Sequence, residues 1–570
     1  MKKFLSFIFY LLSLPALAAQ LPTVLSESDA ETYAQIFELQ RQEKIDAATK
    51  LEPRISDRIL IPDVQYNKYM SRSYRSTGQE IINWLYVNNT LPGADNMMKM
   101  AHRKKVADRA RAPKLPATIS GAAAQNTRSE SWTAKKYSPG TEQNITKFKN
   151  ALRRGNTKNA KDILQDKKIA AALTAEDYGR LSGRLAFIYY CGGYFDFARH
   201  WGTIAADAKS EYGLWTMGLM SWKNGEYPAA EQYFKQMLAL PQINNLRKNE
   251  VLFWAARAAE ANDNYGIARD YWKIAAAASP ASFYGALSNS SLGWTTSYDF
   301  YEDELTDEDI EKLMNTKYGR HAVAALQAGQ PALAEQYLRL LITADASDKQ
   351  LHAVHALATT AELPRTAMQV AGVVRTRGIL EIDDDVISAA QYPMPDWEPL
   401  GGWSLDRALL FAIVRQESGF KTAAKSVKGA NGVMQIMPKT AKLTAPNIRE
   451  LDMANPNHNM SVGQQHIVDL LQLPNVDGNI IKMLISYNAG NGALAKFEKT
   501  FQTDDPLLFI ESFPNTETRT YVKKVLSNLW LYRARLGQPL RGITELTEGK
   551  WPMYESQDDF VLRRGEIKPV

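Results

Sequence analysis

Apolar residues recur along this chain at helical spacing, and alternating strand patterns are scarce. In the stretch 404–418 they recur at i, i+3, i+4, i+7 and i+8, which forms one apolar stripe on a helix. The residues are Leu405, Ala408, Leu409, Ala412 and Ile413. Ser404 is a suitable N-cap for this helix, and Gly419 is a suitable C-terminal stop. The pattern predicts a mostly all-α protein with a helix that begins at Ser404.

A degenerate repeat is found between residues 141 and 345. Each copy has a short loop, an aromatic or apolar residue, an alanine, and an aromatic residue about four positions later. The alanines are Ala160, Ala198, Ala230, Ala268 and Ala334. The pattern resembles tetratricopeptide-type repeats, in which stacked helical hairpins bury their apolar sides against one another and form a superhelix. We therefore expect an α-superhelical domain over residues 20–345.

Changes in composition and in hydrophobic periodicity suggest the remaining domain boundaries. Six basic residues between Arg103 and Lys114 precede a stretch with little periodicity, which predicts a basic loop over 102–140. A solvated loop is preferred there over a surface that touches a cell wall. The segment Tyr392–Pro399 contains three prolines and breaks the helical pattern. We expect a helical linker domain over 346–395, a second domain over 396–545, and a tail over 546–570 to which the sequence assigns no role.

The first residues read as an export signal. Lys2 and Lys3 precede an apolar run that ends in small residues, which is typical of a signal peptide cleaved after Ala18 or Ala19. No cysteine stands directly after the predicted cleavage site, so a lipoprotein is not expected. The one cysteine, Cys191, is predicted to be a buried thiol. The protein is therefore expected in the periplasm; association with the cell wall or the outer membrane is left open.

Composition narrows the possible functions. The 570 residues carry a formal net charge of +6 and are 45% hydrophobic, which indicates a globular protein of two to four domains. The modest charge, without a basic motif interleaved with aromatic residues, gives no reason to expect nucleic acid as a partner. The seven histidines are scattered, and no phosphate loop or dinucleotide motif is present. We therefore expect no metal and no cofactor.

Glu417 is the candidate for acid–base chemistry. It falls in the last turn of the predicted helix, beside Ile413 and Val414. Apolar neighbours and the negative end of the helix dipole both disfavour the ionised carboxylate, so the pKa of Glu417 should be raised. A glutamate that stays protonated near neutral pH can act as a general acid. Taken alone, a solvated glutamate at a helix end is the simpler interpretation.

Three further motifs accompany the Glu417-Ser418 pair. They are GANGVMQ at 429–435, SYNAGNG at 486–492, and ESFPNTETRTYVKKVL at 511–526. In this order and at these separations they resemble the catalytic domain of the soluble lytic murein transglycosylases, which has a lysozyme-like fold related to goose-type lysozyme. The resemblance is specific over the last third of the chain. Two conservative departures are Val433 for the usual leucine and Ser486 for the frequent alanine.

The resemblance implies a fold and a reaction. Proteins of this family place a helical superhelix, closed into a ring, ahead of the catalytic domain. They cleave the β-1,4 bond between N-acetylmuramic acid and N-acetylglucosamine in peptidoglycan and leave 1,6-anhydromuramic acid ends. One glutamate, here Glu417, acts first as acid and then as base. Peptidoglycan strands are the implied substrate, and other cell-wall enzymes are possible partners of the superhelix.

The resemblance also implies supporting residues. Those expected at the substrate are Ser418, Ser426, Met434, Gln435, Tyr487, Asn488 and Tyr521. Glu517, one helical turn before Tyr521, is expected to act on these residues without contacting the substrate itself. Two alternatives stay open at this point. One is a hydrolytic muramidase, although no second carboxylate is evident near Glu417; the other is a non-catalytic repeat scaffold that recruits cell-wall enzymes.

Overall fold

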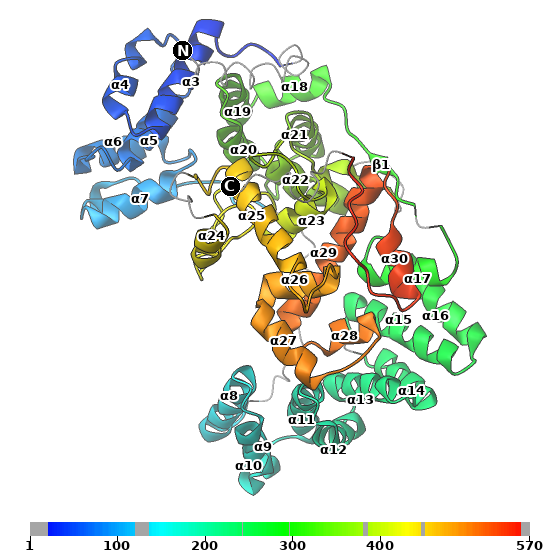
Figure 1. Cartoon of the computed structure of the whole chain (residues 1–570). Helices are drawn as coiled ribbons and strands as arrows, with labels where there is room; N and C mark the ends of the chain where they lie inside the picture. The colour runs from blue at the N-terminus through cyan, green and yellow to red at the C-terminus, as the bar shows by residue number, and fades with distance from the viewer. Residues whose placement is uncertain are drawn as a thin grey trace. The chain divides into compact units, whose positions relative to one another are not determined.

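The computed structural model describes residues 21–119, 136–241, 243–295, 297–379, 386–445 and 451–559. Within these ranges the chain is helical apart from two short strands (Figure 1). The strands β1 (Phe300–Tyr301) and β2 (Ile387–Ser388) pair in parallel. The predicted all-α class is therefore confirmed. The predicted signal peptide, 1–19, lies outside the described ranges.

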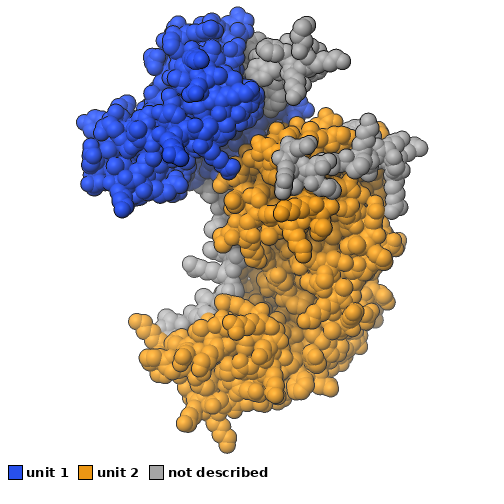
Figure 2. Space-filling model, turned by 60° about the vertical axis from the view of Figure 1, so that its left-hand side comes forward, with its two compact units in different colours: residues 1–124, 300–396 blue, residues 125–299, 397–570 orange. Residues whose placement is uncertain are grey.

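The chain divides into two compact units, each built from two separate stretches of sequence (Figure 2). Unit 1 comprises residues 1–124 and 300–396, and unit 2 comprises residues 125–299 and 397–570. This division does not follow the linear order of the predicted domains, whose boundaries stay a prediction. Among the described residues, none of the helices has both the length and the apolar character needed to cross a membrane.

Unit 1 is a set of helical hairpins around one apolar core. Its first stretch contains α3 (Glu27–Arg41), α4 (Ile45–Thr49), η1 (Glu52–Arg54), α5 (Ile61–Met70), α6 (Gly78–Asn88), α7 (Ala94–Arg103) and η2 (Ala107–Arg109). Its second stretch contains β1, α18 (Asp307–Met314), α19 (Lys317–Gln327), α20 (Pro331–Arg339), α21 (Asp348–Thr360), α22 (Pro364–Arg377), β2 and η3 (Ala389–Gln391). Buried residues of both stretches form a single cluster, so the two halves of unit 1 share a core.

Unit 2 joins an array of hairpins to the C-terminal helices. The array contains α8 (Pro139–Arg153), α9 (Thr157–Gln165), α10 (Lys167–Ala172), α11 (Ala175–Cys191), α12 (Phe195–Asp207), α13 (Glu211–Lys223), α14 (Tyr227–Leu238), α15 (Asn245–Ala261), α16 (Tyr265–Ala278) and α17 (Phe283–Ser291). The C-terminal helices are α23 (Arg407–Ser418), α24 (Pro438–Thr444), α25 (Pro456–Leu471), α26 (Ile480–Ala489), α27 (Asn491–Thr500), α28 (Pro506–Ser512), α29 (Thr516–Arg535) and α30 (Arg541–Thr547). Cys191 at the end of α11 is buried, as predicted.

The repeat alanines occupy equivalent places in the hairpins. Each is the fourth residue of the second helix, in α9, α12, α14, α16 and α20, and each is fully buried. The turn before each second helix has one residue with positive φ; these are Gly155, Gly193, Gly225, Asp263 and Gly329. The backbone N–H groups of this residue and the next one donate to carbonyls at the end of the first helix, which satisfies groups that the helix leaves unpaired.

Two more hairpins in unit 1 use the same turn. Glu43 between α3 and α4 has φ 58°, and Glu362 between α21 and α22 has φ 49°. The fourth residue of each second helix is again a buried alanine, Ala48 or Ala367. The sequence pattern missed these two copies because glutamate stands where most of the other turns have glycine. Hydrogen bonds in the turn hold these residues in the left-handed region despite the cost to a side chain that has a Cβ.

The hairpin array of unit 2 packs directly against the C-terminal helices. Asp505, just before α28, accepts hydrogen bonds from Trp222 and Arg257 of the array, at 2.9 Å and 3.0 Å. Lys523 of α29 pairs with Glu250 of α15 and with Glu511 of α28. All of these groups are largely removed from solvent. The hairpin array therefore supports α28 and α29 through these contacts.

Candidate active site

Helix α23 carries Glu417 and is buried over most of its length. Its residues Ala408 to Val414 are all buried, and the helix ends at Gly419, whose φ is 53°, as predicted. The predicted N-cap, Ser404, is wrong, because the N-cap is Asp406 and α23 begins at Arg407. The N–H groups of Asp406 and Arg407 donate to Tyr554 and Asp558, at 3.0 Å and 2.8 Å. The C-terminal segment, and not a local serine, therefore caps this helix.

The Glu417 side chain is half-buried at the C-terminal end of α23. Burial raises the pKa of Glu417 to about 7. The Tyr521 hydroxyl acts in the opposite direction on this pKa, and the charge of Glu517 raises it further. A carboxyl group with a pKa near 7 is populated in both protonation states at neutral pH, so it can donate a proton and take one back.

A tight loop at residues 424–436 follows α23. Asn431 pairs in antiparallel bridges with Lys425 and Ile436, and Gly432 has φ 76°. Asn459 of α25 holds this loop: its side-chain oxygen accepts from Met434 N at 2.8 Å, and its amide donates to the Asn431 carbonyl at 3.1 Å. A Cβ at position 432 would lie 2.0 Å from the Asn459 amide nitrogen, so this close approach requires glycine.

Tyr487 connects this loop to the other two motifs. Its hydroxyl donates to the Met434 carbonyl at 2.7 Å. Its ring stacks on Tyr521, with 6.5 Å between ring centroids and 6° between planes. The pKa values of Tyr487 and Tyr521 are both raised, first by burial and then by the charge of Glu417. The loop at 424–436, the end of α26 and the start of α29 therefore meet at Glu417.

The Tyr521 hydroxyl is buried, and its hydrogen bonding is not satisfied by the described residues. No well-formed hydrogen bond to it is found among the described residues. After burial, the charge of the Glu417 carboxyl is the largest cause of the raised pKa of Tyr521. The polar contact between the two groups raises this pKa further. The pair is therefore close enough to interact electrostatically but falls short of a well-aligned hydrogen bond.

The structure places the remaining sequence-predicted residues in well-defined contacts. Ser418 Oγ donates to the Val414 carbonyl at 3.1 Å, and Ser426 Oγ accepts from Ala430 N at 2.9 Å. The Met434 side chain is fully buried and packs on Gly463. Gln435 has φ 49°, and its amide donates to the Gly432 carbonyl at 2.9 Å. Asn488 Oδ1 accepts from Thr518 Oγ1 at 2.7 Å.

Two acidic residues near this site have different surroundings. Glu517, in the first turn of α29, is exposed and acts on Glu417 through its charge. Asp406, at the other end of α23, is fully buried and accepts from the backbone of Gln557 and Asp558 and from Ser556. Asp406 is therefore engaged in holding the C-terminal segment.

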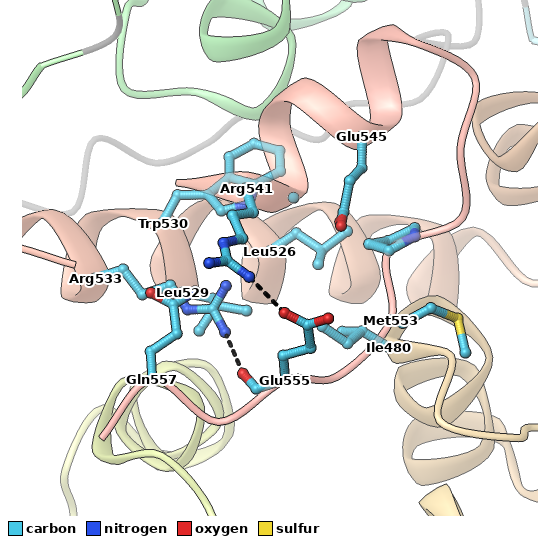
Figure 3. Close-up of a pocket in the computed structure, with 12 residues that line it drawn as sticks. Ile480, Leu526, Leu529, Trp530, Arg533, Arg541, Glu545, Met553, Glu555 and Gln557 are labelled. Carbon is cyan, nitrogen blue, oxygen red and sulfur yellow. Dashed lines mark hydrogen bonds and ion pairs between the residues drawn. The ribbon is translucent and has the colours of Figure 1, made fainter. Parts of the chain in front are cut away.

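Sequence reasoning missed Asn459 and the C-terminal segment at 551–558. The position of Asn459 in the first turn of α25 gave no signal, whereas its contacts fix the loop at 424–436. A small pocket lies under the C-terminal segment, between α29 and α30 (Figure 3). There, Arg541 pairs with Glu555, and Arg533 donates to the Glu555 carbonyl. Its interior has room for about one water molecule, so it is not a sugar site.

The closest pair of histidines in the sequence, His352 and His355, has acidic partners in the structure. His355 Nδ1 lies 2.7 Å from Asp303, and His352 Nδ1 lies 2.9 Å from Asp309. These contacts are hydrogen-bonded pairs inside unit 1. In the described parts of the chain, no group of three or more potential ligands has an arrangement that would hold a metal ion.

Comparison with known proteins assigns the domain that contains Glu417. Residues 399–509 match the family model of the transglycosylase SLT domain, so the chain carries a domain of this class. Its relatives include the soluble lytic murein transglycosylase of Salmonella typhimurium, which is 34% identical over 144 residues. That alignment covers 24% of this chain and 22% of the relative, so the chain matches about a fifth of the length of this relative. The predicted resemblance is confirmed for this domain.

Solved structures extend the likeness to the helical part. The 70-kDa soluble lytic transglycosylase of Escherichia coli matches with a TM-score of 0.56 over 92% of this chain and 99% of that chain, at 16% identity. A complex of the 70-kDa soluble lytic transglycosylase with bulgecin A matches with the same TM-score. At this identity the match shows the fold alone. It confirms the predicted combination of a helical superhelix and a lysozyme-like domain, whereas ring closure stays a prediction.

Proposed function

We propose that this protein is a lytic transglycosylase that cleaves the β-1,4 bond between N-acetylmuramic acid and N-acetylglucosamine in peptidoglycan. The main observation is the half-buried Glu417, with a pKa of about 7, at the meeting point of three motifs. The SLT domain at 399–509 and its similarity to soluble lytic murein transglycosylases support the choice of substrate. A murein substrate is in turn consistent with the predicted export signal and the periplasmic location that it implies.

In the proposed reaction Glu417 serves twice. The protonated carboxyl donates its proton to the glycosidic oxygen as the bond to the muramic acid carbon breaks, and N-acetylglucosamine leaves as an alcohol. The resulting carboxylate then takes the proton of the muramic acid 6-hydroxyl, whose oxygen attacks the same carbon and closes the 1,6-anhydro ring. The enzyme returns to its starting state, and no water is consumed. A tethered hydroxyl can outcompete water because well-oriented intramolecular attack has effective molarities of about 10⁵ M or more.

The surroundings of Glu417 fit both protonation states. Burial disfavours the charged carboxylate, and the Tyr521 hydroxyl supports it. We propose that Gln435, Tyr487 and Asn488 contact the sugars, with Asn488 near the charge that develops at the reacting carbon. Ser426 and Met434 would support the loop on which this contact surface is built, because their side chains bond to its backbone or pack in the core. Ser418 would support the end of α23, where its hydroxyl donates to the Val414 carbonyl.

Product analysis separates this reaction from hydrolysis. Purified peptidoglycan is digested with the parent protein, and the soluble products are examined by mass spectrometry. Anhydromuramic acid ends are expected; products heavier by one water would instead establish a muramidase. Glu417→Gln keeps the size of the side chain but has no proton to transfer, and it is expected to lower turnover by about 10²–10⁴-fold. If this variant digests peptidoglycan as fast as the parent, Glu417 is not the catalytic acid; if neither protein digests it, the scaffold hypothesis replaces the enzyme.

A further inference from the structure

A strongly basic face in unit 1 takes no part in the proposed reaction. We name it by its six cations: Arg103, Lys104, Lys105, Arg109, Arg111 and Lys114. All six are exposed, and none forms an ion pair with a residue that the structure describes. Between residues 97 and 119 the one acidic residue is Asp108, which is also exposed. The face therefore carries a concentrated positive charge that the neighbouring chain does not neutralise.

The basic face is a built surface and not a free loop. Residues 109–114 lie along the end of α6: Lys114 N donates to the Asn89 carbonyl at 2.8 Å, and the Asn89 amide donates to the Ala112 carbonyl at 2.7 Å. Val106, just after α7, packs against Gly78 at the start of α6. These contacts attach residues 106–114 to both ends of α6, and Arg103, Lys104 and Lys105 directly precede this attached segment.

Two exposed apolar side chains belong to the same surface. Tyr86 and Val87, in the last turn of α6, are 66% and 73% exposed. The Arg111 guanidinium lies 5.8 Å from the centroid of the Tyr86 ring and donates to the Tyr86 carbonyl at 3.3 Å. An exposed aromatic ring beside cations offers a stacking surface for a sugar ring and charge-assisted hydrogen bonds to carboxylates.

We propose that the basic face is a second binding site for peptidoglycan, which recognises the carboxylates of the peptide stems next to the glycan. The proposal rests on the proposed function, because it assumes the same substrate. A polymer can bind the catalytic domain and a second site at once, so the two contacts raise the apparent affinity more than either does alone. The basic face would therefore matter for long peptide-bearing strands and not for short soluble fragments.

Binding is measured in the Glu417→Gln protein, so that the substrate stays intact. Sedimentation with insoluble peptidoglycan compares this protein with a version that also carries Lys104→Gln, Lys105→Gln and Arg109→Gln. Three exposed charge contacts together are expected to change the affinity about tenfold at low salt. The matched control replaces Lys158, Lys167 and Lys168, which are exposed in unit 2, with glutamine and is expected to bind as before.

The same assay with peptidoglycan whose carboxylates have been converted to neutral methylamides tests the chemistry of recognition. The proposal expects the difference between the basic-face variant and its control to disappear there, and to shrink with added salt on intact peptidoglycan. Equal binding of the two variants to intact peptidoglycan would overturn the proposal. So would an equal loss on peptidoglycan with neutralised carboxylates, or a loss confined to vesicles of anionic phospholipid, which would assign the face to a membrane surface.

Catalysis supplies an independent readout. In the active background, the basic-face variant should digest insoluble peptidoglycan several-fold more slowly but cleave a soluble disaccharide-repeat fragment at the parent rate. If the parent itself produces no anhydro ends, the proposed reaction fails, whereas the binding result still decides the basic face. Unchanged thermal midpoints show that the variants are folded, and Lys104→Glu alone is a second, milder test with the same expected direction.

Discussion

The raised pKa of Glu417 predicts a stability that depends on pH. The folded protein holds this proton up to a pH of about 7, whereas an unfolded chain releases it near the ordinary value of 4.5. The folded state therefore binds more protons than the unfolded state between these two values, and its stability falls as the pH rises through that window. Replacing Glu417 with glutamine removes this loss, so the variant should gain stability relative to the parent as the pH rises.

The size of the gain follows from the shift. One pKa unit corresponds to about 1.4 kcal/mol, so a shift from 4.5 to about 7 gives a gain of about 3 kcal/mol at pH 8. At pH 5, where Glu417 of the unfolded chain is only partly ionised, the same arithmetic gives a stability gain of less than about 1 kcal/mol for the variant. A difference of about 2 kcal/mol should separate the two conditions and move the thermal midpoint by several degrees.

Differential scanning calorimetry of both proteins at pH 5, 6, 7 and 8 measures this difference. The exposed Glu398→Gln variant, which removes a surface charge from the same unit, is the control and should track the parent. A Glu417→Gln gain that is the same at every pH would refute the reasoning, because it would show that the carboxyl titrates normally. The same pKa predicts that kcat/KM for peptidoglycan falls above about pH 7, as the general acid loses its proton.

Three further changes test the supporting structure. Asn459→Ala leaves the buried N–H of Met434 without its acceptor, so it should destabilise the protein by about 1–3 kcal/mol in urea unfolding and lower turnover; an unchanged unfolding midpoint would show that the loop holds itself. Lys523→Met leaves Glu250 short of one of its two cationic partners in a buried network and should cost about 3–5 kcal/mol, with partial recovery in a variant that also carries Glu250→Gln. Asp263→Gly should stabilise the hairpin between α15 and α16 by up to about 1 kcal/mol, because φ at that position is 58°; a lower thermal midpoint would contradict this.

Local patterns predicted much of the site. The helical stripe before Glu417, the glycine stop at 419 and the glycine-rich loop at 429–435 follow from spacing and from backbone freedom, both of which are properties of short segments. The raised pKa of Glu417 also followed from its immediate neighbours. The contacts of Met434 did not, because whether a methionine lines a groove or fills a core depends on what α25 places against it.

The sequence by itself determined the all-α class, the repeating hairpins with a buried alanine, and the acid at the end of a buried helix. Each of these depends on residues within a few turns of one another, where periodicity and turn chemistry act directly. The tertiary structure alone decided that α23 begins at Arg407, because its first N–H groups find partners about 150 residues later in the chain. It also decided that Asn459 holds the loop beside Glu417 and that residues 112–114 lie against the end of α6, because contacts between distant segments depend on packing that no local pattern encodes.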